Sequence, residues 1–186
     1  MVTATRERTY ADLRGCAELA RYEAFLSAMP PHAKVLDCAT GTGPGAELLR
    51  RQGFAVTGVD VSDEAIAFAS RRYAGIEFVN ASASALPFSD DSFDAVVSIE
   101  TIEHLADPAA ALAEFARVCK PEGVLCLTTP DEGGCDSPFH AVELTAEDLD
   151  GALDAVFGVG GWDCEPVPGA EAWHAMVVRR SAAVQM

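Results

Sequence analysis

A glycine-rich turn between an apolar strand and a helix constrains this chain more than any other segment. The strand is predicted over residues 34–38, the turn carries Gly41 and Gly43, and a helix is predicted over 45–52. Glycine adopts a positive φ at little steric cost and lets a ligand approach the backbone closely. In open parallel sheets, nucleotide-like ligands bind at such a turn. The segment therefore predicts a parallel sheet with a nucleotide-type site at one edge.

A carboxylate follows the second predicted strand. This strand spans residues 54–59 and leads directly into Asp60. A carboxylate in that place suits the hydroxyl groups of a ribose, which two ligands share: a dinucleotide and S-adenosylmethionine. Gly41, Gly43 and Gly45 do not form the GxGxxG pattern of dinucleotide sites, and no Tyr-x-x-x-Lys pair is present. The pattern therefore favours S-adenosylmethionine.

Strands and helices alternate along the rest of the chain. Alternation of this kind, with continuously apolar strands, is typical of a parallel sheet that is covered by helices on both faces. Two closely spaced strands at the end predict a hairpin. We therefore predict an α/β fold with a doubly wound, mostly parallel seven-stranded sheet and a C-terminal antiparallel hairpin. Beyond residue 60, the predicted helices span 63–73, 109–118 and 146–157, and the predicted strands span 76–80, 93–99, 123–129, 162–167 and 173–180.

Length favours one domain. A chain of 186 residues can bury a core as a single unit, so we predict one domain over residues 1–186. Its N-terminal helical cap covers residues 1–30, with a helix over 7–29, and its cofactor-binding core covers 31–181. Tyr22 of this cap is either a packing residue or a contact to the ligand.

The formal net charge of −16 argues against a nucleic-acid partner, because neutralising phosphates needs clustered Lys and Arg. No apolar run approaches the roughly 20 residues that span a bilayer, and the N-terminus lacks the apolar core of a signal peptide. The six cysteines show no CxxC spacing, which is typical of a reduced, cytoplasmic protein. A small-molecule partner is expected, and the oligomeric state is left open.

Four motifs, in order along the chain, give it a resemblance to a known family. They are Val35–Gly45, Val59–Ser62, Leu86–Asp94 and Arg117–Gly123. In these motifs the chain resembles the class I S-adenosylmethionine-dependent methyltransferases, in particular small ones of the ubiquinone-biosynthesis type and sugar O-methyltransferases. The resemblance covers roughly residues 30–180 and implies a Rossmann-like methyltransferase fold with S-adenosylmethionine as cofactor.

The resemblance also implies which residues hold this cofactor. Asp37 would organise the turn and meet the methionine end, Asp60 would bind the ribose, and Val61 would pack on the adenine. Ala39 departs from the family by replacing a glycine, which is compatible with the turn if its φ stays negative. Ser82 replaces a common Asp, which removes a charge-assisted acceptor for the adenine amino group. The implied cofactor-binding residues are Asp37, Ala39, Thr40, Gly41, Gly43, Asp60, Val61, Ser82, Ala83, Ile99 and Glu100.

A second group of polar residues follows the predicted strand 93–99. Glu100, Glu103 and His104 are three and four positions apart, which places their side chains on neighbouring faces if the segment is helical. They form an E-x-x-E-H pattern, and His140 follows on a later loop. This combination resembles two groups, the ubiquinone-biosynthesis O-methyltransferases and the small-RNA 3′-terminal 2′-O-methyltransferases. Carboxylates and imidazoles can hold a divalent metal, and an imidazole can accept a proton from a hydroxyl. The candidate catalytic residues are His104, His140 and Glu103, and the candidate metal ligands are Glu100, Glu103, His104 and His140.

The predicted activity is methyl transfer from S-adenosylmethionine to a hydroxyl of a small molecule, such as a sugar, a phenol or a natural-product intermediate. The cofactor supplies the activated methyl group, so the protein mainly aligns the nucleophile. A divalent metal is a candidate second cofactor that would assist loss of the hydroxyl proton. Three alternatives stay open: N-methylation of a small amine, 2′-O-methylation of RNA, and a partner protein that binds S-adenosylmethionine without catalysis.

Overall fold

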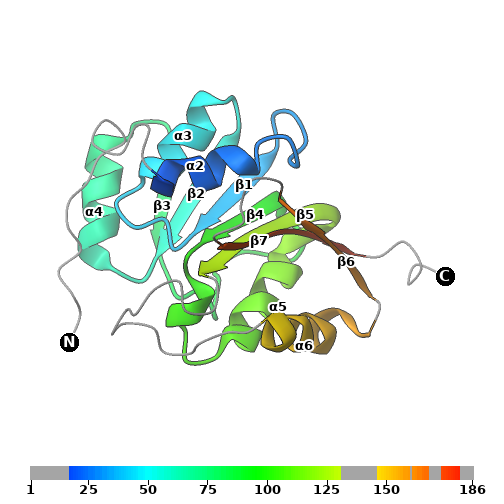
Figure 1. The fold of residues 1–186 in the computed structure, drawn as a ribbon. Helices are drawn as coiled ribbons and strands as arrows, with labels where there is room; N and C mark the ends of the chain where they lie inside the picture. Colours follow the sequence, from blue (N-terminus) through cyan, green and yellow to red (C-terminus); the bar gives the residue numbers. More distant parts are fainter. Residues whose placement is uncertain (1–16, 131–145, 160, 168–172, 181–186) are drawn as a thin grey trace.

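The computed structural model of the protein describes residues 17–130, 146–159, 161–167 and 173–180. Its strands form one seven-stranded sheet in the order β3-β2-β1-β4-β5-β7-β6 (Figure 1). Neighbouring strands are parallel except in the β5–β7 and β6–β7 pairs, which are antiparallel. The predicted fold class, including its C-terminal hairpin, is thereby confirmed. The strands are β1 Lys34–Cys38, β2 Ala55–Asp60, β3 Glu77–Asn80, β4 Phe93–Ile99, β5 Cys119–Pro130, β6 Trp162–Pro166 and β7 Trp173–Arg180.

Helices cover both faces of the sheet. Helices α2 (Ala17–Ala24), α3 (Pro44–Arg51) and α4 (Asp63–Arg72) lie on one face, and α5 (Pro108–Val118) and α6 (Ala146–Phe157) lie on the other (Figure 1). Among the helices described, none combines the length and the apolar composition that crossing a membrane requires.

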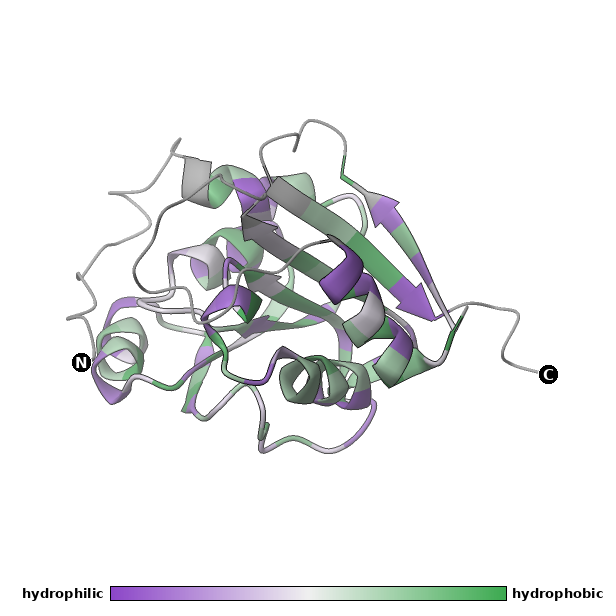
Figure 2. Cartoon of the chain, turned by 60° about the horizontal axis from the view of Figure 1, so that its bottom comes forward, coloured by the Kyte–Doolittle hydropathy of each residue, from purple (hydrophilic) through white to green (hydrophobic). Residues whose placement is uncertain are grey.

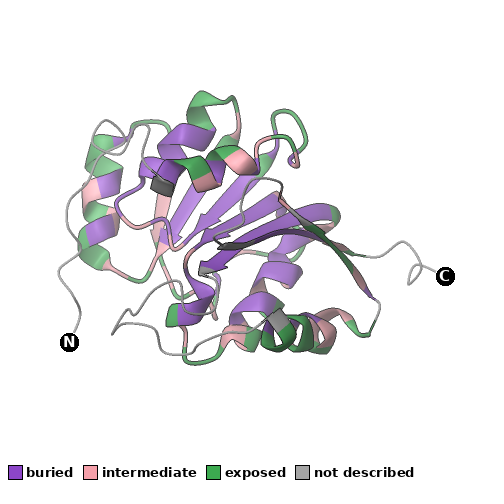
Figure 3. Cartoon of the chain, in the orientation of Figure 1, coloured by how far each residue is buried: buried purple, intermediate pink, exposed green. Residues whose placement is uncertain are grey.

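The alternation of side chains along each strand fills two cores. In β1, Val35 packs with residues of α2, α3 and α4, whereas Leu36 and Cys38 pack with residues of α5 and α6. In β4, Val97 packs in the core beneath α2, α3 and α4, and Val96 packs in the core beneath α5 and α6. Successive side chains of a strand point to opposite faces, so a strand covered on both sides must be apolar throughout. The sheet is accordingly mainly hydrophobic (Figure 2) and buried (Figure 3), whereas the outer turns of the helices are exposed.

Two segments differ from the sequence-based prediction. Strand β5 begins at Cys119, rather than at residue 123, because Cys119 pairs with Phe93 across an irregularity in the register. The predicted N-terminal helix over 7–29 is described only from residue 17 onward, and α2 ends at Ala24. Beyond it, Phe25 and Ala28 donate to carbonyls three residues back, so turns replace the helix there.

The sheet order reverses between β1 and β4. From β1 the chain proceeds to β2 and β3 on one side and then returns to β4 on the other. Ligands of open α/β sheets bind outside the carboxyl ends of the strands at such a switch point. Asp37 lies near the end of β1 and Glu100 directly follows β4, while Cys38 is in register with Ser98. The fold thus brings both carboxylates to the edge where a ligand is expected.

Candidate functional site

The turn after β1 is built from residues with positive φ. The φ angles of Ala39, Gly41 and Gly43 are 62°, 55° and 86°. A Cβ at Gly41 would have no heavy atom within 4 Å, so the backbone faces open space there. A Cβ at Gly43 would lie 2.9 Å from the ring of Phe78, so packing as well as φ requires glycine there. The turn therefore offers bare backbone to a ligand at Gly41 and is held tightly at Gly43.

Ala39 does not have the negative φ that was the condition for its fitting this turn. Its φ of 62° lies in the left-handed region, which costs an L-residue roughly 1–2 kcal/mol. The next residue, Thr40, donates its backbone N–H to the carbonyl of Val59 at 2.9 Å, which ties the turn to β2. The turn thus keeps a conformation that suits glycine better, and the hydrogen bond to β2 helps to offset the strain.

Asp37 lies completely buried beneath this turn. Its Oδ1 accepts a hydrogen bond of 3.0 Å from the hydroxyl of Tyr22, and its Oδ2 accepts one from the hydroxyl of Thr40. Burial raises the pKa of Asp37 to about 6, although both hydroxyl donors favour the charged form. Asp37 therefore links the turn to helix α2 through a carboxylate whose charge is expensive to bury.

Tyr22 packs helix α2 against the end of the glycine turn. A Cβ added at Gly45 would lie 2.1 Å from Cζ of Tyr22, so the tyrosine ring occupies the space that any other side chain would need. The ring is buried, with 7% of the residue exposed. Of the two roles left open by the sequence, the structure shows packing, together with the hydrogen bond to Asp37.

Asp60 ends strand β2 with both carboxylate oxygens oriented by the backbone. Oδ2 accepts from the N–H of Gly41 and Oδ1 from the N–H of Ser62, each at 2.8 Å. Each oxygen keeps a lone pair for a further donor. The next side chain, Val61, is 76% exposed. A half-buried carboxylate and an exposed apolar side chain thus lie next to one another, as the hydroxyls and the base of a nucleoside require.

The loops after β2 and β3 are joined by Asn80, a residue that the sequence analysis missed. Its amide donates to the carbonyls of Asp60 and Val61 at 3.2 and 3.0 Å. The only sequence signal was its position at the end of a strand. Ser82 follows on the same edge, where its hydroxyl accepts the N–H of Ser84 at 3.2 Å, and Ala83 packs against the core.

Glu100 does not belong to a helical turn. Its φ of 50° is left-handed, and the single 3₁₀ turn η1, Ile102–His104, begins only after it. Oε1 of Glu100 accepts from the Thr128 hydroxyl at 2.9 Å, and its N–H donates to the same hydroxyl at 3.0 Å. Oε2 lies 3.6 Å from Nη2 of Arg21 in α2. The expected helical spacing from Glu100 is therefore not formed, because β5 and α2 hold this residue instead.

Glu103 and His104 form an acid–imidazole pair on η1. Glu103 is 2% exposed, and neither of its carboxylate oxygens accepts a hydrogen bond within the described part of the protein. Oε1 lies 3.8 Å from Nε2 of His104, whose side chain is 42% exposed. Burial raises the pKa of Glu103, and the nearby charge of Glu100 raises it further. The pair thus joins a buried acid to an imidazole that solutes can reach.

The structure does not support the predicted metal site. Within the ranges described, no three His, Cys, Asp or Glu side chains gather in a way that could hold a metal ion. Glu100 faces Thr128 and Arg21, whereas Glu103 is buried. His140 lies outside the described residues.

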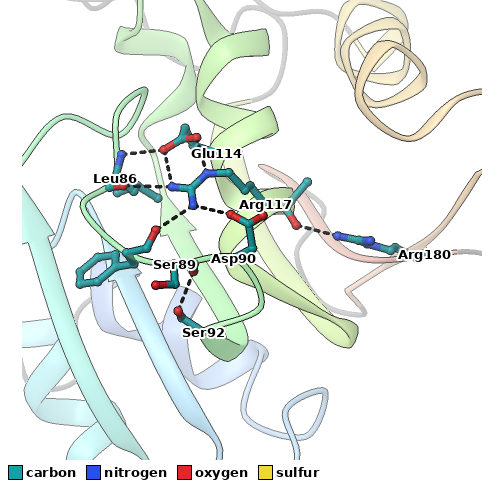
Figure 4. A network of polar contacts seen from close by, with 9 residues as sticks. Leu86, Ser89, Asp90, Ser92, Glu114, Arg117 and Arg180 are labelled. Atoms are coloured by element: carbon teal, nitrogen blue, oxygen red, sulfur yellow. Dashed lines mark hydrogen bonds and ion pairs between the residues drawn. The ribbon is translucent and has the colours of Figure 1, made fainter.

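Two of the sequence motifs, Leu86–Asp94 and Arg117–Gly123, are joined by the side chain of Arg117. Its guanidinium, at the end of α5, holds the loop that leads into β4 (Figure 4). The acceptors are the carbonyls of Leu86 and Phe88 and the carboxylates of Asp90 and Glu114. These motifs therefore act as one structural unit that supports the sheet.

An open groove of about 750 Å³ lies between α5, α6 and the start of β5. Its lining includes Ala113, Phe157 and Arg180 and none of the predicted site residues. The groove is at the amino edge of the parallel strands, so it is separate from the carboxyl edge described above.

Comparison with known proteins adds independent findings. Residues 36–127 match the family model described as "Methyltransferase domain". A Mycobacterium tuberculosis protein named "Probable S-adenosylmethionine-dependent methyltransferase" is 35% identical over 169 residues, covering 84% of this chain and 62% of that protein. A demethylmenaquinone methyltransferase of Chlorobaculum tepidum is 40% identical over 98 residues, covering 52% of this chain and 40% of that protein. The chain thus spans less than two thirds of the length of either relative.

A solved structure has the same fold. The crystal structure of a TehB-like SAM-dependent methyltransferase from Corynebacterium glutamicum matches with a TM-score of 0.73 at 20% identity, over 92% of this chain and 94% of that one.

Proposed function

Because the chain belongs to the class I S-adenosylmethionine-dependent methyltransferases, we propose that it transfers the methyl group of this cofactor to a hydroxyl of a small molecule. The observation that carries the proposal is the placement of two groups on one sheet edge. Asp60 and Val61 offer a nucleoside-type site, and the Glu103–His104 pair lies just beyond β4.

The residues present fit the cofactor. The lone pairs left on Asp60 suit the ribose hydroxyls, and the exposed Val61 side chain suits the adenine. The open space beside Gly41 lets the chain of the methionine end pass close to the backbone. When bound, the cofactor supplies a methyl group activated by a sulfonium. We assign Ala39, Thr40, Gly43, Ser82, Ala83 and Ile99 to the lining of the same site, with Asp37 and Glu100 at the methionine end.

The acid–imidazole pair supplies the base. A hydroxyl must lose its proton to attack the methyl carbon, and a neutral imidazole accepts a proton near neutral pH. Glu103, within 3.8 Å of Nε2, orients the ring of His104 and stabilises its protonated form when ionised. His140 is proposed as a second group that contacts the acceptor. We propose a small molecule as acceptor, since a chain with a formal net charge of −16 is poorly suited to attract nucleic acid.

The test is a pair of substitutions assayed with a panel of sugars, phenols and amines. His104→Ala should lower kcat by about 100-fold or more and leave S-adenosylhomocysteine affinity unchanged. Glu103→Gln should lower kcat less. His32→Asn serves as the control, because His32 is exposed, has a φ of 60°, and lies in the turn before β1. Equal turnover of the His104→Ala and control proteins would remove His104 from the mechanism.

The relatives favour a second candidate, methylation of a carbon, because a Desulfotalea psychrophila relative is named a ubiquinone/menaquinone biosynthesis C-methyltransferase. The Chlorobaculum tepidum relative is named a demethylmenaquinone methyltransferase and covers half of this chain. Removing the proton of a phenolic hydroxyl makes both its oxygen and the neighbouring ring carbon nucleophilic, so the same base serves either outcome. Transfer of a ¹³C-labelled methyl group distinguishes them, because NMR separates O-methyl, C-methyl and N-methyl products. Binding without transfer to any acceptor would instead support a non-catalytic partner protein.

A further inference from the structure

The groove between α5, α6 and the start of β5 has apolar side chains on both helices. On α5, Ala109, Ala113 and Ala116 follow at steps of four and three positions, so they lie on one face of the helix. Val156 and Phe157, at the end of α6, line the other side. The volume of about 750 Å³ is in the range of small-molecule pockets. The groove can therefore take an apolar molecule of that size.

Arg180, at the end of β7, adds a positive charge to this apolar lining (Figure 4). Its Nη2 donates to the carbonyl of Ala116 at 2.7 Å, which holds the guanidinium against α5. Among the residues that the structure describes, no carboxylate forms an ion pair with it. Arg117 lines the same groove, but Asp90 and Glu114 both pair with it. The charge of Arg180 is thus the one left for a ligand.

We propose that this groove binds a small molecule with an apolar body and one carboxylate. The planar guanidinium of Arg180 matches the geometry of a carboxylate, and its bond to Ala116 leaves further N–H groups for the ligand. The alanines and the ring of Phe157 cover the apolar body, whose removal from water is favourable. Glu122 also lines the groove, so it opposes a second negative charge on the ligand.

The proposed site is separate from the cofactor edge. Strand β7 runs antiparallel to β5, and its Val178 pairs with Leu125. Arg180 therefore lies toward Gly123, at the start of the parallel strands, whereas Glu100 follows the end of β4. None of the residues assigned to the cofactor lines the groove. The inference accordingly goes beyond methyl transfer and does not depend on it.

Three probes that share a naphthalene body and differ in charge test the inference. They are 2-naphthoate, 2-naphthalenemethanol and 2-naphthylmethylammonium, and calorimetry on the full chain at about 0.15 M salt measures their affinities. The unmodified protein should bind 2-naphthoate with a Kd below about 1 mM and the alcohol about tenfold more weakly. The ammonium should bind more weakly than the alcohol, because it meets Arg180 with a like charge.

Removing the charge should affect the carboxylate alone. Arg180→Gln keeps a donor for the carbonyl of Ala116, and it should weaken 2-naphthoate by about tenfold and the alcohol by less than about twofold. Arg179→Gln is the matched control, because Arg179 is the neighbouring residue and pairs with the exposed Glu165 instead. It should change neither affinity.

Filling the groove should affect both probes. Ala113 is exposed on α5, so Ala113→Leu places a larger side chain in the groove while leucine remains a good helix former. It should weaken 2-naphthoate and the alcohol by about tenfold or more. Ala67→Leu, at an exposed position of α4, is its control and should change neither. Saturating S-adenosylhomocysteine should also leave the affinity for 2-naphthoate unchanged.

Several results would overturn the inference. One is the absence of saturable 2-naphthoate binding up to about 5 mM; another is equal affinity for the carboxylate and the alcohol. Competition with S-adenosylhomocysteine, or unchanged binding in Ala113→Leu, would place the probe elsewhere. If Arg180→Gln does not fold, Arg180→Lys replaces it, because lysine keeps the charge without the fork. A loss of about threefold for 2-naphthoate alone is then expected, and no selective loss would refute the role of Arg180.

Discussion

The hydroxyl of Tyr22 donates a 3.0 Å hydrogen bond to Oδ1 of Asp37, fifteen positions further along the chain. This bond joins the helix that precedes the sheet to the first strand of the sheet. Asp37 is completely buried, so the partner that holds α2 in place is also a group whose ionisation opposes folding. The position of α2 over the glycine turn and the titration of Asp37 are therefore linked.

The stability of the protein should depend on the charge of Asp37. Burial raises its pKa from 3.8 to about 6. Because the pKa is higher in the folded state, this group favours folding below about pH 4, and that contribution is lost as the pH rises through about 6. Asp37→Asn, which mimics the protonated acid, should be the more stable protein above about pH 6 without cofactor, by up to about 3 kcal/mol.

Urea unfolding of both proteins between about pH 5 and pH 7.5 measures this difference. The gap between Asp37→Asn and the unmodified protein should widen as the pH rises. A gap that stays constant over this interval would show that Asp37 has an ordinary pKa.

Removing one carboxylate oxygen of Asp60 should weaken cofactor binding. In Asp60→Asn only one acceptor remains for the N–H groups of Gly41 and Ser62 and for the ribose. We expect S-adenosylhomocysteine affinity to fall by about 10- to 100-fold. Asp63→Asn, three residues on in an exposed position, should stay within about twofold of the unmodified protein. Equal affinities in the two variants would contradict the ribose-binding role.

Arg117 should matter for stability and not for the cofactor. Its guanidinium donates to the carbonyls of Leu86 and Phe88 and to two carboxylates. Arg117→Ala removes the guanidinium from all four acceptors, leaves Glu114 with the N–H of Leu86, and should lower the free energy of unfolding by about 2–4 kcal/mol. Arg179→Ala, whose ion pair with Glu165 is exposed on both sides, should cost at most about 1 kcal/mol.

Urea unfolding and calorimetric titration with S-adenosylhomocysteine check both parts of this prediction. A large loss of affinity in folded Arg117→Ala would mean that the loop it holds contributes to the site directly.

Ala39 is strained by its left-handed φ of 62°. Ala39→Gly relieves the strain and should raise the free energy of unfolding by about 0.5–1 kcal/mol, after the extra flexibility of glycine in the unfolded chain is taken into account. Ala46→Gly in helix α3 should instead lower stability by about 1 kcal/mol, because glycine is unfavourable inside helices. Thermal unfolding compares the two, and a loss of stability in Ala39→Gly would show that the methyl group makes contacts that outweigh the strain.

Most of the fold could be predicted because its signals are local. The apolar runs of the strands, the cap residues of the helices and the glycines of the turns lie within a few residues of the elements they define. The start of β5 was missed because it depends on the pairing of Cys119 with Phe93, a contact across the sheet. The end of α2 was missed for a similar reason, since the alanine periodicity continues past the point where packing ends the helix.

The candidate site could likewise be predicted only where its signals are local in the sequence. The motifs placed Asp37, Asp60 and Glu100 at strand ends, and a parallel sheet brings such ends to one edge. The helical spacing assumed for Glu100, Glu103 and His104 failed, because Thr128 of β5 and Arg21 of α2 hold Glu100 outside η1. No sequence pattern reports a bond between residues that far apart.

The sequence alone determined the fold class, the edge of the sheet at which the candidate site is expected and the family that the chain resembles, because periodicity and the order of motifs are properties of neighbouring residues. Only the tertiary structure decided that Tyr22 packs against the glycine turn, that Arg21 faces Glu100 and that Glu103 is buried beside His104. Burial and charge pairing arise between segments that meet only when the sheet has formed, and they set the pKa of Asp37 and Glu103 and the electrostatics of the site.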